Sequence, residues 1–223
     1  MFAKKKERIM KKVLCLLIAL VTLVAFCGCF GGNNEDPVTD PAKTPEFALG
    51  KVVDNVFTNE FTGLSFAAPE GWIFYSEEQI LQLNNIAFDY LDEKAYEMIQ
   101  NAAIVYDMYA SAPIGGGNTN VNLEKIDASL IEKLDLKQTL ESQFGLLEDA
   151  YKNMGFTDFS IQYEKIAVDG KEFDGMSLSA KISGRTYYSK CFIYKNGTYL
   201  VNVASGAYSE SELADIINRF SVK

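Results

Sequence analysis

Three short turn sequences divide the C-terminal half of the chain and constrain its fold more than any other feature. They are Asp169-Gly170, Ser183-Gly184 and Asn196-Gly197, each between two segments of strand-like composition. Asn-Gly and Asp-Gly pairs accept the positive φ angles that tight hairpin turns demand, so we expect a hairpin at each site. The hairpins predict a meander of four antiparallel strands, at about Phe159 to Val168, Asp174 to Ile182, Thr186 to Tyr194 and Thr198 to Ser205.

The second of these strands indicates that one face of the meander is buried. Its apolar residues Met176, Leu178 and Ala180 alternate with Ser177 and Ser179. Such alternation is typical of a sheet that packs on a core with one face and meets solvent with the other.

Capping patterns and apolar stripes at helical spacing predict three helices. The second helix is followed by a glycine, which suits a helix end in the left-handed conformation. In the first helix, Ser76 and Gln79 precede an apolar stripe from Ile80 to Tyr90. In the second, Asp135 precedes a stripe from Leu140 to Met154, and Gly155 follows it. In the third, Ser209 and Glu212 precede a stripe from Leu213 to Phe220.

Four further strand candidates complete the pattern and give the element order ββαββαββββα. Runs of antiparallel strands with flanking helices indicate an α+β fold, a mainly antiparallel sheet in an α/β/α sandwich. Residues 48–223 are a suitable length for one such domain with its own core. The further strand candidates are Phe57 to Ala68, Trp72 to Tyr75, Ala103 to Ala110 and Thr119 to Ile126.

The segment from Glu60 to Trp72, EFTGLSFAAPEGW, resembles the start of PsbP-like domains. It is an extended stretch that ends in Pro-x-Gly-Trp, and the order of elements after it is similar throughout. The resemblance covers roughly Val53 to the C-terminus. It implies a mostly non-catalytic family of assembly factors, adaptor subunits and extracytoplasmic lipoproteins. The matching positions are structural: Pro69 and Gly71 serve a turn, and Trp72 fills the core or covers a groove.

The first 28 residues are typical of an export signal. Six basic residues precede an apolar run of 14 residues, Val13 to Phe26, which is the layout of a signal peptide. The end of the run resembles the lipobox of bacterial lipoproteins, in which a cysteine after a small residue receives the lipid and becomes the mature N-terminus. Gly28 before Cys29 fits that pattern, so we expect Cys29 to be lipidated. Phe26 and Cys27 depart from it, since leucine and a small residue are usual there.

An uncleaved membrane helix is the alternative, because residues 13–30 carry no charge and approach the ~17 to 25 residues that a span needs. The cysteines and glycines at the end of the run, and the segment after it, favour cleavage. Residues 29–47, an acidic stretch rich in proline and glycine, cannot bury enough apolar surface to fold, so we expect a flexible linker. Both alternatives place the domain on the extracytoplasmic face of the cell membrane.

The net charge limits the classes of partner that the chain can bind, and the cysteine content limits the chemistry of the domain. The chain has 21 basic and 30 acidic residues; without the six basic residues and Glu7 of the signal, 15 against 29 remain, a net charge of −14. So acidic a chain repels nucleic acid and anionic lipid, and we expect no nucleic-acid partner. Lipidation of Cys29 leaves Cys191 alone in the domain, where we interpret it as a small buried hydrophobic residue.

The sequence excludes most catalytic classes. It contains no histidine, which removes Ser-His-Asp and Cys-His nucleophilic systems and the ordinary zinc sites. It has no nucleophile elbow, phosphate loop or calcium loop. The glycine run at 115–117 is interpreted as a connection between strands. Adjacent carboxylates, as at Glu148 and Asp149, point about 100° apart on a helix and do not converge on one substrate. We predict no catalytic residue, metal site or cofactor.

One candidate recognition surface remains. Tyr106 and Asp107 lie on one strand candidate, and Asn118, Asn120 and Asn122 approach and enter the next. If the two strands pair, aromatic and amide groups share a face, as in many interfaces. The alternative is that the asparagines form the solvent side of an alternating strand whose Val121 and Leu123 point inward.

These observations favour a lipid-anchored, non-enzymatic binding or assembly module outside the cytoplasmic membrane. Its expected partners are the membrane, through the N-terminal lipid, and an envelope protein or a small ligand. The alternatives are a carboxylate-dependent hydrolase of the cell envelope, which needs two acids in one cleft, and a structural subunit of an envelope complex.

Overall fold

The structure is a computed structural model that describes residues 47–84, 102–113 and 116–223. The predicted signal peptide, the lipidation site Cys29, the linker up to residue 46 and the end of the first predicted helix lie outside the described residues. The described elements are β1 (Lys51–Val53), β2 (Val56–Asn59), β3 (Leu64–Ala67), β4 (Ile73–Phe74), α2 (Glu77–Leu83), β5 (Ile104–Ser111), β6 (Asn118–Lys125), α4 (Ala128–Ile131), α5 (Leu136–Asn153), β7 (Thr157–Val168), β8 (Lys171–Ile182), β9 (Arg185–Asn196), β10 (Tyr199–Ala207), α6 (Glu210–Asn218) and β11 (Phe220–Val222).

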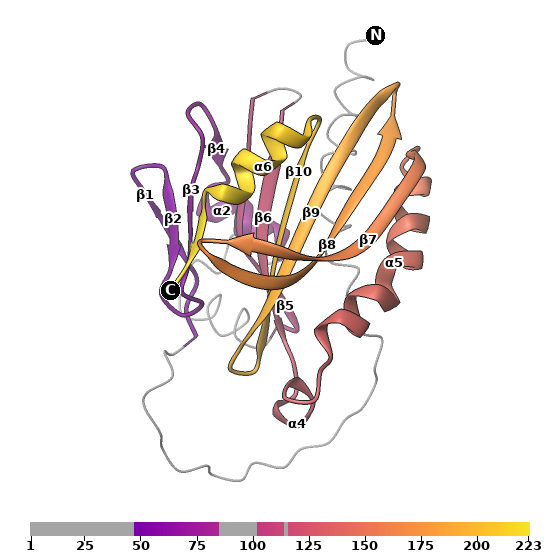
Figure 1. The fold of residues 1–223 in the computed structure, drawn as a ribbon. Helices are drawn as coiled ribbons and strands as arrows, with labels where there is room; N and C mark the ends of the chain where they lie inside the picture. Colours follow the sequence, from indigo (N-terminus) through magenta and orange to yellow (C-terminus); the bar gives the residue numbers. More distant parts are fainter. Residues whose placement is uncertain (1–46, 85–101, 114–115) are drawn as a thin grey trace, which may run out of the picture.

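The predicted meander is confirmed. Strands β7, β8, β9 and β10 pair antiparallel in sequence order. Each of the three predicted turns contains a glycine with positive φ, at Gly170, Gly184 and Gly197. The first three strands are 12 residues long, and they rise as a curved sheet on one side of the molecule (Figure 1).

The meander is part of a seven-stranded sheet with the order β4-β5-β6-β10-β9-β8-β7. A second sheet of four short strands has the order β1-β2-β3-β11. Both sheets are antiparallel throughout. The predicted α+β class, a mainly antiparallel sheet flanked by helices, is therefore confirmed.

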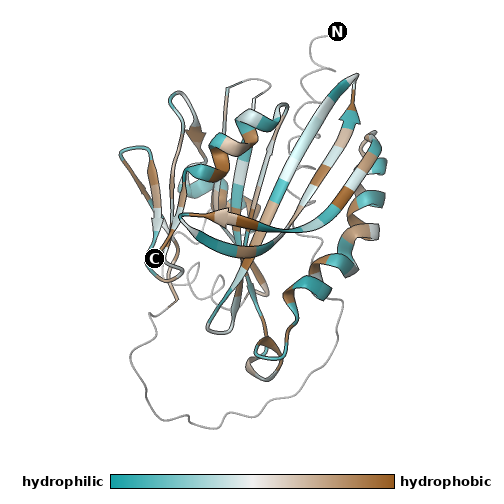
Figure 2. Cartoon of the chain, viewed as in Figure 1, coloured by the Kyte–Doolittle hydropathy of each residue, from teal (hydrophilic) through white to brown (hydrophobic). Residues whose placement is uncertain are grey.

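The large sheet has a packed core on each face. On one face, Val201, Val203 and Phe192 pack with Phe66 of the small sheet and with Ile216 of α6. On the other face, α5 packs on the long strands through one apolar stripe. Hydrophobic and hydrophilic residues alternate along these strands in Figure 2, as expected for side chains that point to opposite faces.

The helix caps are mostly as predicted. Ser76 and Gln79 form both hydrogen bonds of a capping box. The side chain of Asp135 accepts from the Gln138 backbone N–H at 3.0 Å, and Gly155 follows α5 with a φ of 89°. These contacts satisfy amide groups that a helix end leaves unpaired.

The cap of α6 differs from the predicted box. Ser209 accepts from the Glu212 backbone N–H, but the Glu212 carboxylate instead accepts from the backbone N–H of Gly117 at 2.8 Å. A Cβ at Gly117 would come within 2.7 Å of Ile216. The glycine run, predicted as a plain connection, is thus held at its end against α6.

Two boundaries predicted at the ends of the domain are wrong. The segment from Phe57 to Ala68 is a hairpin of β2 and β3, because Asn59 accepts from the Thr62 N–H and Gly63 has a φ of 72°. Phe220, predicted at the end of the last helix, instead begins β11, which pairs with β3. The turn predicted before Trp72 is present: the Trp72 N–H donates to the Pro69 carbonyl at 3.2 Å.

Candidate functional site

The two strands of the predicted recognition surface do pair. Tyr106 on β5 lies opposite Asn122 on β6, and Tyr109 lies opposite Asn120. Val121 and Leu123 point into the core with no exposed surface. The structure thus brings Tyr106, Asn120 and Asn122 together on one face of the large sheet.

Asp107 does not join them. Adjacent strand residues point to opposite faces, so Asp107 faces the small sheet, and a β-bulge between Tyr106 and Met108 returns Tyr109 to the face of Tyr106. Its two carboxylate oxygens accept from the Gly50 backbone N–H and from Asn59 Nδ2, each at 2.6 Å. Burial outweighs these hydrogen bonds and raises the pKa of Asp107 to about 6. The residue therefore fastens the start of the domain to the large sheet.

The asparagines are not the solvent side of the strand. Asn120 is 2% exposed and Asn122 is 3% exposed. Among the described residues, Asn120 Oδ1 and Asn122 Nδ2 have no hydrogen-bond partner. Asn118, at the start of β6, lies on the same face and hydrogen-bonds Tyr187. Four of the five predicted residues thus share one face, Asp107 lies on the other, and recognition by any of them stays a prediction.

Glu124 extends the same row of β6 side chains. It is 8% exposed, and burial raises its pKa to about 7, because an ionised carboxylate loses its hydration in the protein interior. This end of β6 therefore holds a carboxyl group that takes up a proton near neutral pH.

A groove that the sequence did not indicate lies on the other face of the large sheet, between the long strands and α6. Helix α6 has nine residues and is about 14 Å long, whereas strands of 12 residues extend about 40 Å. The helix is too short to cover β7, β8 and β9 on this face. The hollow beside it measures about 580 Å³, a volume common among small-molecule sites.

The floor of the groove consists of polar side chains in register across three strands. All of them point to the α6 side, because they alternate with residues that pack on α5. The strand pairing sets them in two rows, Ser160–Ser179–Tyr188 and Gln162–Ser177–Lys190.

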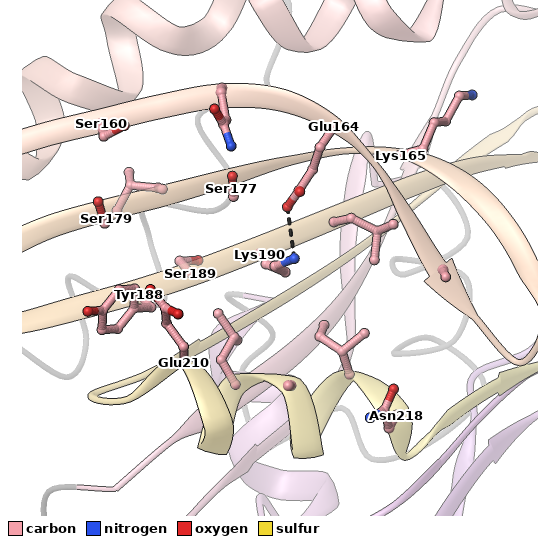
Figure 3. A pocket seen from close by; sticks show the side chains of 17 residues that line it. Ser160, Glu164, Lys165, Ser177, Ser179, Tyr188, Ser189, Lys190, Glu210 and Asn218 are labelled. Atoms are coloured by element: carbon pink, nitrogen blue, oxygen red, sulfur yellow. Dashed lines mark ion pairs between the residues drawn. The ribbon is translucent and has the colours of Figure 1, made fainter.

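One ion pair spans this floor. Glu164 Oε1 lies 2.9 Å from Lys190 Nζ, and Figure 3 shows the two side chains meeting between the strands and α6. Both side chains are about one-third exposed, so the pair contributes little to stability. Its consequence for the site is that the two charges cancel.

Helix α6 forms the other wall. It presents Leu213, Ala214 and Ile217 to the groove, with Glu210 and Asn218 at its two ends. A second, more open hollow continues past the start of α6. It shares Tyr188 and Glu210 with the first and adds Arg185 and Tyr208. The guanidinium of Arg185 lies 4.1 Å from the centre of the Tyr208 ring. The site is therefore elongated and has both polar and apolar surfaces.

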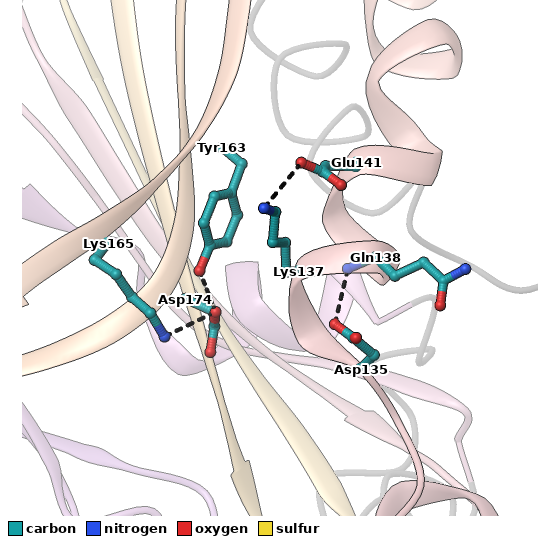
Figure 4. Close-up of polar contacts among 7 residues, drawn as sticks. All are labelled: Asp135, Lys137, Gln138, Glu141, Tyr163, Lys165 and Asp174. Carbon is teal, nitrogen blue, oxygen red and sulfur yellow. Dashed lines mark hydrogen bonds and ion pairs between the residues drawn. The ribbon is translucent and has the colours of Figure 1, made fainter.

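The α5 side of the sheet carries a different polar cluster (Figure 4). Asp174 Oδ1 accepts from the Tyr163 hydroxyl at 2.6 Å and from Lys165 Nζ at 2.9 Å. Partial burial raises the pKa of Asp174, but these two hydrogen bonds outweigh it and hold the pKa below its ordinary value. Lys137 of α5 lies 5.0 Å from the centre of the Tyr163 ring. Tyr163, Lys165 and Asp174 hydrogen-bond within the cluster, and the contact of Lys137 with the Tyr163 ring ties α5 to the sheet.

Other candidate chemistry in the described part of the chain is limited. No cluster of three or more potential metal-ligating side chains occurs in these ranges. Burial raises the pKa of the Cys191 thiol to about 12, which fits the predicted role as a small buried residue. No helix among the described residues has the length and apolar character to cross a membrane.

No protein-family model matches the chain, and no curated protein matches its sequence. The resemblance to PsbP-like domains and the lipobox therefore stay predictions. Solved structures with a similar arrangement include a protein of Bacteroides thetaiotaomicron VPI-5482, with a TM-score of 0.41 and 13% identity over 76% of this chain. The match covers 48% of that protein, so the chain spans about half its length.

A second similar structure is LpqN, described as involved in cell envelope biogenesis of Mycobacterium tuberculosis. The TM-score is 0.39 at 11% identity, and the match covers 72% of this chain and 83% of LpqN. At such TM-scores neither similarity carries an argument about function, which has to come from the chain itself.

Proposed function

We propose that this chain is a lipid-anchored binding protein of the extracytoplasmic membrane face, and that the groove between α6 and β7–β9 is its binding site. The observation that carries the proposal is the groove floor. It places neutral donors and acceptors, Ser177, Ser179 and Gln162, on paired strands of a rigid sheet. The short serine side chains are pre-organised by the strands, so they bind a ligand with little loss of side-chain freedom.

The location rests on the sequence. The basic start, the apolar run and Gly28-Cys29 fit a lipoprotein precursor. The linker that follows would hold the domain, and with it the groove, away from the bilayer.

Binding without turnover is favoured by the state of the charged groups in the groove. Of the carboxylates that line it, Glu164 is engaged by Lys190 at 2.9 Å, and Glu210 lies at the exposed start of α6. A hydrolase of the carboxylate type needs one free acid and one free base on opposite sides of the bond that it cleaves.

The anchor is tested by metabolic labelling with a fatty acid. Wild type should incorporate the label and a Cys29→Ser variant should not. Incorporation by that variant would refute Cys29 as the lipidation site.

The groove is tested with the full-length protein in membranes and a soluble digest of the purified cell envelope. We expect the digest to raise the unfolding temperature of wild type, because a ligand that binds only the folded state stabilises it. A Ser177→Trp substitution fills the centre of the floor and should abolish the rise, whereas Ser142→Trp, on the exposed side of α5, should retain it. An equal rise in the Ser177→Trp variant would contradict the proposal.

The same incubation separates binding from hydrolysis. Mass spectrometry of the digest should recover every fragment unchanged after incubation with wild type. Fragments that shorten with wild type, but not with Glu164→Gln, would favour the hydrolase.

A further inference from the structure

We infer that the groove takes a neutral, polyhydroxylated ligand, an oligosaccharide several sugar units long; this inference rests on the proposed function of the groove. The first reason is the charge balance. The chain is strongly acidic once the signal is set aside, with 15 basic against 29 acidic residues. The groove floor is different, because Glu164 and Lys190 neutralise each other at 2.9 Å. An anionic ligand would meet the repulsion of the acidic domain, because Lys190 and Lys165 at the groove are paired with Glu164 and Asp174 and Arg185 lies away from the floor, over the Tyr208 ring.

The second reason is the kind of hydrogen-bonding group on the floor. Serine hydroxyls at 160, 177 and 179 both donate and accept, and so does the carboxamide of Gln162. Groups that can do both are suited to hydroxyls, which also do both. The rows are set by the distance between neighbouring strands, about 4.8 Å, which is comparable to the length of one sugar ring. Successive rings of a chain could therefore meet successive strands.

The third reason is the apolar wall. Exposed Ala214 of α6 faces the polar floor across the groove, beside the accessible edges of Leu213 and Ile217, which are 4% and 5% exposed, and Tyr188 lines both hollows. A sugar ring has hydroxyls around its edge and C–H groups on its faces. Such a ring satisfies both surfaces, whereas a fully polar solute would leave the α6 wall without apolar contact.

A peptide fits the groove less well. Peptides that bind to sheets add a strand to an edge and use main-chain hydrogen bonds. The groove lies on the face of the sheet, where the main chains of β8 and β9 are already paired on both sides. On the floor formed by β8 and β9 a peptide backbone would have only side-chain partners, and only the outer edge of β7 could pair with an added strand. The continuation of the groove toward Arg185 and Tyr208 favours an elongated ligand over a single sugar.

The test uses full-length protein in a detergent without a sugar head group and measures binding of four probes. These are chitohexaose and cellohexaose as neutral oligosaccharides, oligogalacturonate as an acidic one, and an uncharged hexapeptide. We expect saturable binding of at least one neutral oligosaccharide. Raising the salt from about 0.05 to 0.5 M should change its affinity less than about twofold, because screening acts on charges.

Substitutions locate the binding site. Gln162→Ala should weaken neutral oligosaccharide binding by about three- to tenfold, the effect of one neutral hydrogen bond, and Ser177→Ala combined with Ser179→Ala by about tenfold or more. Gln138→Ala and Ser142→Ala, both exposed on α5, are the matched controls and should bind like wild type. Gln162 is itself exposed, so its replacement leaves the fold intact.

The outcomes distinguish the two proposals. Binding of the peptide or of oligogalacturonate that Gln162→Ala weakens, without binding of either neutral oligosaccharide, overturns the ligand class and leaves the groove as a binding site. Neutral oligosaccharide binding that Gln162→Ala and the double serine variant leave unchanged overturns the site. Absence of binding for all four probes overturns this inference, whereas the digest experiment decides the proposed function independently.

Discussion

Replacing Glu124 by glutamine should stabilise the protein at alkaline pH and leave its stability unchanged in acid. Glu124 is 8% exposed, and burial raises its pKa from an ordinary 4.5 to about 7. The folded state therefore keeps the Glu124 proton at pH values where the unfolded chain has lost it. The stability of wild type should fall as the pH rises from about 4.5 to about 7, and the contribution of Glu124 should then level off.

The magnitude follows from the two pKa values. Their difference, 7 − 4.5, is about 2.5, and each pH unit corresponds to about 1.4 kcal/mol, so ionised Glu124 costs at most about 3.5 kcal/mol. Glutamine has nearly the same shape and stays neutral, but its amide also has to be hydrogen-bonded. We expect Glu124→Gln to raise the free energy of unfolding by about 1 to 3 kcal/mol at pH 8 and by about zero at pH 4.

Urea denaturation at a series of pH values measures this difference. Fluorescence of Trp72 reports unfolding, since it is the single tryptophan of the chain and is partly buried against Phe66. Comparing variant with wild type cancels the contribution of Asp107, which titrates in the same range. Glu172→Gln, at an exposed position on β8, is the control for the change from glutamate to glutamine itself. A gain of equal size at pH 4 and pH 8, or a loss at pH 8, would refute the reasoning.

Two further substitutions test the packing. Gly206→Ala would place a methyl group in the space of the Tyr187 phenol ring and should lower the free energy of unfolding by about 1 to 3 kcal/mol, measured by the same urea transitions; wild-type stability would contradict the close packing of this ring. Asp107→Ala removes the acceptor for the Gly50 N–H and for Asn59 Nδ2 and should cost about 1 to 3 kcal/mol at pH 5. The loss should be smaller at pH 8, because burial penalises the ionised carboxylate of wild type there. Hydrogen exchange of the Gly50 amide should accelerate in this variant, and an unchanged exchange rate would show that the contact is not made.

The elements that sequence predicted well are those with local signals. The turn at Asn196-Gly197, for example, needs only the two residues that adopt its backbone conformation. Similarly, the capping box of Ser76 and Gln79 provides hydrogen-bond partners for backbone N–H groups at the start of α2 from two side chains close in sequence. Such features depend on a few adjacent residues, and tertiary contacts did not override them.

The errors arose where a distant contact decides the structure. Phe220 continues an apolar stripe at helical spacing, yet pairing with β3 converts it to a strand. The bulge at Asp107 leaves no mark in the alternation of residue types, but it reverses the direction of every side chain before it relative to those after it. Tyr109 therefore shares the face of Tyr106, whereas unbroken alternation would place it on the opposite face.

The groove depends on register as well. Ser177 and Ser179 were identified as the polar face of a strand, but their partners Gln162 and Ser160 come from a strand whose alternation is weaker. Only the pairing of β7 with β8 and of β8 with β9 sets these residues in rows. The sequence can predict these rows if each residue of a predicted hairpin is assigned to one face of the sheet and the strand pairing is continued across the turns at Gly170 and Gly184.

Thiol labelling of a groove residue in spheroplasts tests the central claim most directly. A Ser179→Cys variant should react with a membrane-impermeant maleimide if the domain lies outside the membrane as proposed, while buried Cys191 should not react. A saturating neutral oligosaccharide, chitohexaose or cellohexaose, should slow this labelling by about tenfold or more and leave labelling of Ser142→Cys unchanged. Labelling of the Ser179→Cys variant only after lysis, or at a rate that neither oligosaccharide alters, would contradict the account.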